Sequence, residues 1–61
     1  MTVRDAIRLV ERDGWIMVRQ TGSHRQYHHP AKSGTVTISG KPSLDIDPKT
    51  EKSIRCQAGL P

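Results

Sequence analysis

The chain has few of the large residues that fill a hydrophobic core. Its 61 residues include no phenylalanine, one tryptophan, one tyrosine and two methionines, and 33% of the residues are hydrophobic. A chain of this length buries only about 60% of the surface that its unfolded form exposes. We therefore expect one domain over residues 1–61 with a thin core, to which a partner covering one face would add stability.

Cysteine and long apolar segments are also scarce. The single cysteine, Cys56, has no second thiol in the chain with which to form a disulfide. No apolar run approaches the roughly 20 residues of a membrane-spanning helix, and none has the length of the apolar region in a secretory signal peptide. These absences predict a cytoplasmic protein that makes no contact with a membrane.

Acidic residues are outnumbered by basic ones. Six aspartates and glutamates against ten lysines and arginines give a formal net charge of +4, and the pI is near 9.9. This balance suits a polyanionic ligand such as a nucleic acid. An ordinary solvated basic surface is an equally good interpretation, because charge alone does not define a site.

The two ends of the chain carry the spacing of helices. Apolar residues recur at helical intervals after a capping-box-like start at Thr2, which predicts a first helix that ends at Asp13 with Gly14 as its cap. Near the other end, Asp47 followed by a proline is a typical helix start, and Gly59 closes this second helix.

Three short strands are predicted between the helices. Trp15–Gln20 is an apolar run too short for a helix, and Thr21–Ser23 is the turn that follows it. His24 begins a second strand, which Pro30 ends because proline has no ladder donor. Thr35–Ile38 alternates as a third strand, and two hairpin connections make the sheet antiparallel.

A loop rich in glycine, proline and serine separates the third strand from the second helix. It runs from Ser39 to Ile46. We expect Leu44 and Ile46, its aliphatic side chains, to pin it to the core.

Side chains alternate along the second strand, which divides its residues between two faces. One face receives His24, Gln26 and His28. The other receives Arg25, Tyr27 and His29. On that second face, Tyr27 is expected in the core and His29 in a structural hydrogen bond beside Pro30.

The spacing of the histidines opposes a metal site. On an extended strand, His24 and His28 stand roughly 13 Å apart, whereas zinc–nitrogen bonds are about 2.1 Å long. We therefore predict no metal site and no other cofactor.

His24 is the candidate catalytic residue. It directly follows a Gly22-Ser23 turn, where RNA could approach closely. Histidine can take the proton from a ribose 2′-hydroxyl at neutral pH, so that the oxygen attacks the neighbouring phosphate without a metal. Considered without other information, a lone histidine is more often structural, and Ser23 would either bind phosphate or only hold the turn.

Further residues are candidates for contact with RNA, with a dispersed basic surface as the alternative for the cationic ones. The candidates are Gly22, Ser23, Arg19, Arg25, His28, Lys32 and Lys41.

The segment Gly22–Pro30 carries the pattern Gly-Ser-His-x-x-Tyr-x-His-Pro. With Gly14-Trp15 before it and Gln57-Ala58-Gly59-Leu60 after it, it resembles the HicA, or YcfA-like, family of toxin ribonucleases, the mRNA interferases of type II toxin–antitoxin systems. The likeness covers nearly the whole chain. It implies an α+β domain of α-β-β-β-α order, with a three-stranded antiparallel sheet and two helices on one face, like a double-stranded-RNA-binding domain.

The resemblance also implies a function. The chain would be an endoribonuclease with His24 as its catalytic residue, messenger RNA as its substrate and a HicB-type antitoxin protein as its partner. It would be a monomer or weak dimer when free.

The second helix departs from the family pattern. Glu51 and Arg55 stand where family members usually carry leucines, which leaves mainly Ile54 and Ala58 on the inward face. Either the helix packs through a shifted face that uses Cys56, or it is less firmly docked. Two alternatives to the toxin ribonuclease therefore stay open: a non-catalytic RNA-binding module, and a degenerate toxin that serves as a protein-interaction domain.

Overall fold

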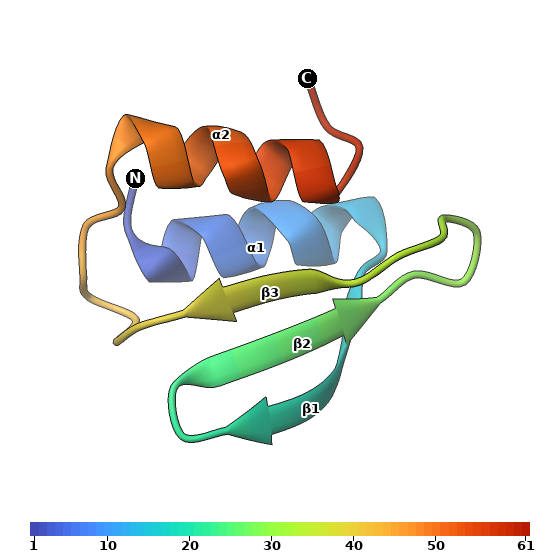
Figure 1. Cartoon of the computed structure of the whole chain (residues 1–61), viewed down its shortest axis with the longest axis horizontal. Helices are drawn as coiled ribbons and strands as arrows, with labels where there is room; N and C mark the ends of the chain where they lie inside the picture. Colours follow the sequence, from blue (N-terminus) through green and yellow to red (C-terminus); the bar gives the residue numbers. More distant parts are fainter.

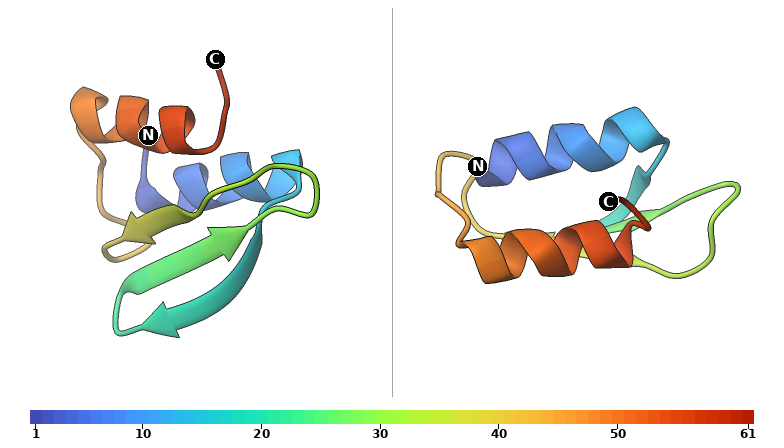
Figure 2. Two further views of the ribbon diagram at one scale, coloured as in Figure 1. Left: turned by 45° about the vertical axis from the view of Figure 1, so that its right-hand side comes forward. Right: turned by 90° about the horizontal axis from the view of Figure 1, so that it is seen from above.

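The computed structural model describes all 61 residues. The elements are α1 (Val3–Asp13), β1 (Ile16–Thr21), β2 (His24–His28), β3 (Val36–Ser39) and α2 (Pro48–Gln57). The strands form one antiparallel sheet in the order β1-β2-β3. Both helices cover the same face of this sheet and run side by side in the same direction, which leaves the other face open (Figures 1 and 2). The predicted fold class is confirmed, and neither helix is long and apolar enough to cross a membrane.

Helix α1 begins and ends at the predicted residues. The Asp5 backbone N–H donates to Thr2 Oγ1 at 3.2 Å, and the Thr2 N–H donates to Asp5 Oδ2 at 2.9 Å. This reciprocal pair satisfies two donors that the first turn of a helix leaves free. At the other end, Gly14 adopts the left-handed conformation with φ of 106°, which glycine adopts without strain.

Helix α2 also starts as predicted, with Asp47 Oδ1 accepting from the Thr50 N–H at 3.0 Å. Beyond its last turn, Gly59 has a φ of 67° and its N–H donates to Cys56 O. The helix packs through Ile54 and Ala58, which are 4% and 0% exposed. The shifted face that would use Cys56 is therefore wrong, because Cys56 is exposed.

The two residues of α2 that depart from the family pattern form an ion pair with each other. Arg55 Nε lies 3.2 Å from Glu51 Oε2, one helical turn away, and both side chains are about one-third exposed, at 32% each. They lie at the edge of the buried face and leave its centre to Ile54 and Ala58. The helix is docked without the leucines.

Two strands are displaced by one residue from their predicted bounds. Trp15 precedes β1 because its N–H donates to Val10 O and continues the hydrogen bonding of the helix end. The indole is buried, with 2% of its surface exposed. Ser39 belongs to β3 because it pairs with His24.

The core lies between the helices and the strands nearest to them. Its nine residues are Val3, Ala6, Val10, Trp15, Tyr27, Val36, Ile38, Ile54 and Ala58. Strand β1 contributes none of them, because the helices lie above β3 and β1 is the strand farthest away (Figure 1). Consequently Ile16, Met17 and Val18 are 60%, 45% and 53% exposed.

The loop before α2 is held by its backbone more than by its side chains. The Val3 N–H donates to Leu44 O at 2.8 Å, and the Ile46 N–H donates to Met1 O at 2.8 Å. Ile46 packs against the core as predicted. The prediction for Leu44 is wrong, since 56% of its surface is exposed.

Candidate active site

Strand β2 divides its side chains between two environments. The helix-facing residues Arg25 and Tyr27 are 9% and 1% exposed, while His24, Gln26 and His28 are exposed on the open face. The predicted alternation is confirmed. The fold therefore holds His24 on a rigid strand and presents it to solvent.

Two hydroxyl side chains flank His24 on the open face. In the register of the sheet, His24 pairs with Thr21 of β1 and with Ser39 of β3. Directly opposed residues of neighbouring strands point to the same face and lie about 4.5–5.5 Å apart at Cβ. The exposed imidazole therefore stands between two groups that can donate to or accept from a bound phosphate.

The turn before His24 leaves room for a ligand. Gly22 has a φ of 59°, and nothing lies within 4 Å of the position that a Cβ would occupy. Its carbonyl accepts from Gln20 Nε2 at 3.0 Å. The Ser23 carbonyl also has structural partners, while its side chain is exposed. Ser23 thus holds the turn through its backbone and leaves its hydroxyl accessible.

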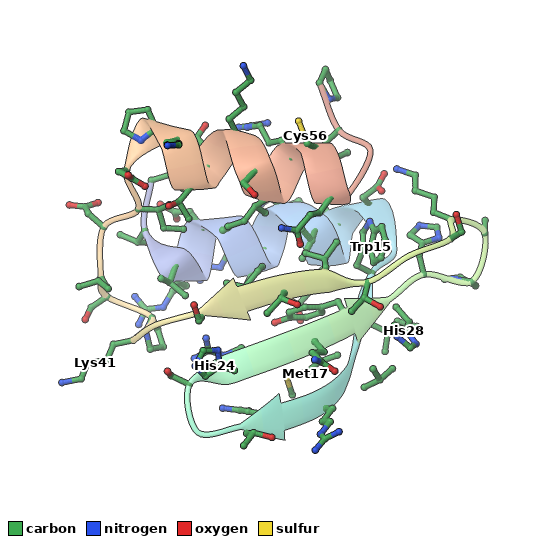
Figure 3. All side chains as sticks on the ribbon, in the orientation of Figure 1. Trp15, Met17, His24, His28, Lys41 and Cys56 are labelled. Carbon is green, nitrogen blue, oxygen red and sulfur yellow. The ribbon has the colours of Figure 1, made fainter.

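Two candidate contacts lie on the open face with His24. Arg19 pairs with Gln26 in the register between β1 and β2 and is exposed. His28 lies at the far end of β2 from His24 (Figure 3), where its Nε2 is 3.3 Å from Thr35 Oγ1. His24, Arg19 and His28 thus lie along β2 on one accessible face.

Lys41 lies at the same end of the molecule as His24, in the loop that follows β3 (Figure 3). The loop between β2 and β3, which carries Lys32, lies at the opposite end of the sheet (Figure 1). Lys32 Nζ donates to Asp13 Oδ2 at 2.5 Å and to Ala58 O at 3.0 Å. That hydrogen bond lowers the pKa of Asp13 below the ordinary value of 3.8, and the positive charge of Lys32 acts in the same direction.

Arg25 points away from His24, as the alternation predicts. Its Nη1 donates to Gly40 O at 3.0 Å and to Ser23 O at 3.3 Å. Burial and the Glu11 carboxylate raise the pKa of the neighbouring Tyr27 hydroxyl, while the Arg25 charge opposes the rise. The structure thus brings Arg19 and His28 to the open face and Lys41 and the turn to the His24 end of the sheet, and it engages Arg25 and Lys32 in hydrogen bonds within the fold.

His29 has the structural role that the sequence predicted. Its Nδ1 accepts from the N–H groups of Ala31 and Lys32 at 2.9 and 3.1 Å. The other ring nitrogen, Nε2, therefore carries the hydrogen and donates to Asp13 O at 2.7 Å. The ring also meets Trp15 edge-on, with the ring centroids 5.3 Å apart. All the polar atoms of this imidazole are used inside the fold.

Two features of this region were missed from the sequence. The pairing of His24 with Ser39 depends on the register between β2 and β3. The loop that joins these strands contains no turn motif from which the register can be predicted. The exposed apolar run Ile16–Val18 was identified as strand, but nothing local shows that β1 is the strand the helices leave uncovered. The predicted turn Thr21–Ser23 is one residue too long, because Thr21 belongs to β1 and pairs with His24.

The order of elements and the helices gathered on one face define a domain of the double-stranded-RNA-binding type. A family model described as the HicA toxin of bacterial toxin–antitoxin systems matches residues 3–60, and the chain belongs to this family. It is similar to a chain in the solved structure of a toxin–antitoxin complex from Streptococcus pneumoniae, with 33% identity, a TM-score of 0.78 and coverage of 98% of both chains. No curated protein gives a significant match.

Proposed function

We propose that this chain is the ribonuclease toxin of a toxin–antitoxin pair and that it cleaves messenger RNA by general acid/base catalysis at His24, without a metal ion. The observation that carries the proposal is the state of His24: an exposed imidazole on a rigid strand, between two hydroxyl side chains, on the open face of the sheet. Membership of the HicA toxin family supports the same function.

The chemistry needs one group that takes a proton. His24 accepts the proton of a ribose 2′-hydroxyl, and the oxygen then attacks the adjacent phosphorus. The bond from phosphorus to the 5′ oxygen breaks, that oxygen takes a proton from solvent water, and His24 releases its proton to solvent. The products are a 2′,3′-cyclic phosphate and a 5′-hydroxyl. His28 does not serve the same phosphate, because four residues along a strand correspond to about 13 Å.

RNA would be held by contacts along the open face. Arg19 and Lys41 are exposed cations suited to phosphate oxygens, and Gly22 and Ser23 allow a close approach beside His24. His28 would meet a nucleotide farther along the strand. Contacts of this kind make binding depend on salt, since each neutralised phosphate releases counterions.

The partner we propose is an antitoxin protein of the HicB type, in the cytoplasm, that covers His24 and the basic face. The similar chain from Streptococcus pneumoniae is part of a toxin–antitoxin complex. Exposed apolar residues also favour a protein partner: Ile16, Met17 and Val18 lie on the uncovered strand β1. A free chain with so thin a core would gain stability from such a partner.

The test is cleavage of a long single-stranded RNA by the wild-type protein and by His24→Ala, at low salt with a chelator present. We expect the variant to lose about 10²–10⁴-fold in rate while its thermal unfolding is unchanged, since the side chain packs against nothing in the core. Equal cleavage by both proteins would place the activity at another site or in a contaminant. Binding without cleavage by either protein would favour the non-catalytic RNA-binding module instead.

A further inference from the structure

Arg25 is the one charged residue that the fold buries, with 9% of its surface exposed. None of the ion pairs in the chain involves it. A buried cation without a carboxylate is costly unless hydrogen bonds replace its water. The hydrogen-bond partners of Arg25 therefore indicate its structural role.

Its hydrogen bonds join two segments that are distant in the sequence. Nη1 donates to Ser23 O in the turn between β1 and β2 and to Gly40 O just after β3, at 3.3 and 3.0 Å. The Gly40 N–H donates directly to Ser23 O at 3.3 Å. These three hydrogen bonds form a closed link between the turn and the loop.

The loop side of this link is fixed from a second direction. Gly40 has a φ of +108°, and a Cβ at this position would lie 3.3 Å from Leu44 Cδ2 and 3.4 Å from Val3 Cγ2. Gly40 is thus held between the Arg25 guanidinium and side chains next to the core. The backbone position of the next residue, Lys41, is therefore fixed as well.

The two linked segments carry the two groups that the proposed reaction uses at this end of the sheet. His24 directly follows Ser23, and Lys41 directly follows Gly40. Figure 3 shows both side chains at the same end of the molecule. The backbone link therefore sets where the acid/base group and the exposed cation stand relative to each other.

We propose that Arg25 is a positioning residue: from the buried side of β2 it ties the turn that carries His24 to the loop that carries Lys41. The consequence for catalysis rests on the proposed function, whereas the link itself does not. Removing the guanidinium takes away two of the three hydrogen bonds of this link and leaves only the direct one from the Gly40 N–H to Ser23 O. A phosphate bound by Lys41 is then held less firmly in line with His24.

The experiment compares Arg25→Met and Arg25→Lys with Arg8→Met, a matched control on the exposed face of α1. Two quantities are measured in each: the hydrogen-exchange rate of the Gly40 amide, relative to amides in α1, and the kinetics of RNA cleavage. We expect Arg25→Met to accelerate Gly40 exchange and to lower kcat/KM, each on the order of tenfold for the lost hydrogen bonds. Arg25→Lys should recover part of both, because its ammonium can donate to one of the carbonyls.

A double-mutant cycle with Lys41→Met separates positioning from general destabilisation. In the wild-type background, Lys41→Met should raise KM. In the Arg25→Met background the same change should add little, because Lys41 no longer acts on a held phosphate. Fully additive effects would overturn the positioning role.

Gly40 exchange that is unchanged in folded Arg25→Met would overturn the link, whether or not RNA is cut. Faster Gly40 exchange with no cleavage by any protein, wild type included, would overturn the ribonuclease proposal and the positioning role while leaving the link as a feature of the fold. If Arg25→Met fails to fold, Arg25→Lys gives the same two readings, since it keeps the charge and most of the aliphatic stem.

Discussion

A histidine at the start of β2 and another just past its end differ in exposure and in hydrogen bonding. His24, at the start of the strand, is exposed. The side-chain hydrogen bonds made by histidines in this fold are those of His28 and His29. The side chain of His29, just past the end of the strand, is 10% exposed, and it makes three hydrogen bonds and an edge contact with Trp15. The same kind of side chain is exposed to solvent at one end and fully hydrogen-bonded within the fold at the other.

The lysines near these two ends differ in the same way. Lys41 extends into solvent at the His24 end (Figure 3), whereas Lys32 bridges the Asp13 carboxylate and the Ala58 carbonyl at the His29 end. Lys32 joins the C-terminal ends of both helices to the loop after β2. The His24 end of the sheet therefore presents its polar side chains to solvent, whereas the polar side chains at the other end hold the helices on the sheet.

His29→Leu should give the largest loss of stability among changes at the two ends. It removes three hydrogen bonds and leaves the Asp13 carbonyl without its donor, which we expect to cost about 2–3 kcal/mol. In a domain of this size that lowers the melting temperature by roughly 10 °C or more. Thermal unfolding followed by circular dichroism measures it.

The variant His29→Asn tests which of these hydrogen bonds contribute to the stability. Its side-chain oxygen can replace Nδ1 as the acceptor for the N–H groups of Ala31 and Lys32, while the contact with Asp13 is lost. It should be destabilised less than His29→Leu. Equal melting temperatures for wild type and His29→Leu would remove the distinction between the two ends.

Arg19→Gln should weaken RNA binding and leave the melting temperature unchanged, an effect of intermediate size. If Arg19 contacts one phosphate, the slope of log K against log salt should fall by about 0.7 for a single strand. The matched change Lys32→Met should leave that slope unaltered, because the Lys32 ammonium is already paired with Asp13. A slope that falls in Lys32→Met and is unchanged in Arg19→Gln would indicate that RNA binds near His29 instead.

The pairing of Asp13 with Lys32 should make a smaller, pH-dependent contribution to stability. The hydrogen bond from Lys32 lowers the Asp13 pKa below 3.8 in the folded state. Stability from this pair is therefore fully present above the unfolded pKa and is lost as the pH falls through the folded pKa. The difference in melting temperature between wild type and Lys32→Met should shrink below about pH 4, and a constant difference would contradict the assignment.

Replacing both Glu51 and Arg55 with leucine should have the smallest effect. An ion pair between residues one turn apart contributes only about 0.3–0.5 kcal/mol when it is exposed, and this pair is partly exposed. The buried contacts of α2 come from Ile54 and Ala58. Urea unfolding should place the double variant within about 1 kcal/mol of the wild type. A large gain would show that α2 is poorly docked in the natural sequence, as the degenerate-toxin interpretation requires.

Local patterns were sufficient to predict most of the fold. The caps at Thr2, Gly14 and Asp47 were correct because capping depends on residues within one turn. The alternation that separates His24 from Tyr27 was also correct, since it follows from strand geometry alone. The exposure of Leu44 was missed because the loop is held by backbone hydrogen bonds to the N-terminus, which composition does not reveal.

The candidate site was predictable in part for the same reason. The position of His24 after a tight turn was visible in the sequence, but the roles of the cations were not. Arg25 and Lys32 were candidate phosphate contacts on the basis of charge. Arg25 bonds to a carbonyl 15 positions away along the chain, and Lys32 bonds to groups 19 and 26 positions away. Hydrogen bonds between residues so far apart along the chain could not be predicted from charge alone.

The most direct test of the account compares His24→Gln and His29→Asn in one experiment that records both melting temperature and RNA cleavage, at a temperature where both proteins are folded. The account predicts a crossover: His24→Gln keeps the wild-type melting temperature and loses cleavage, while His29→Asn melts lower and still cleaves. Cleavage retained by His24→Gln, or lost by folded His29→Asn, would contradict it.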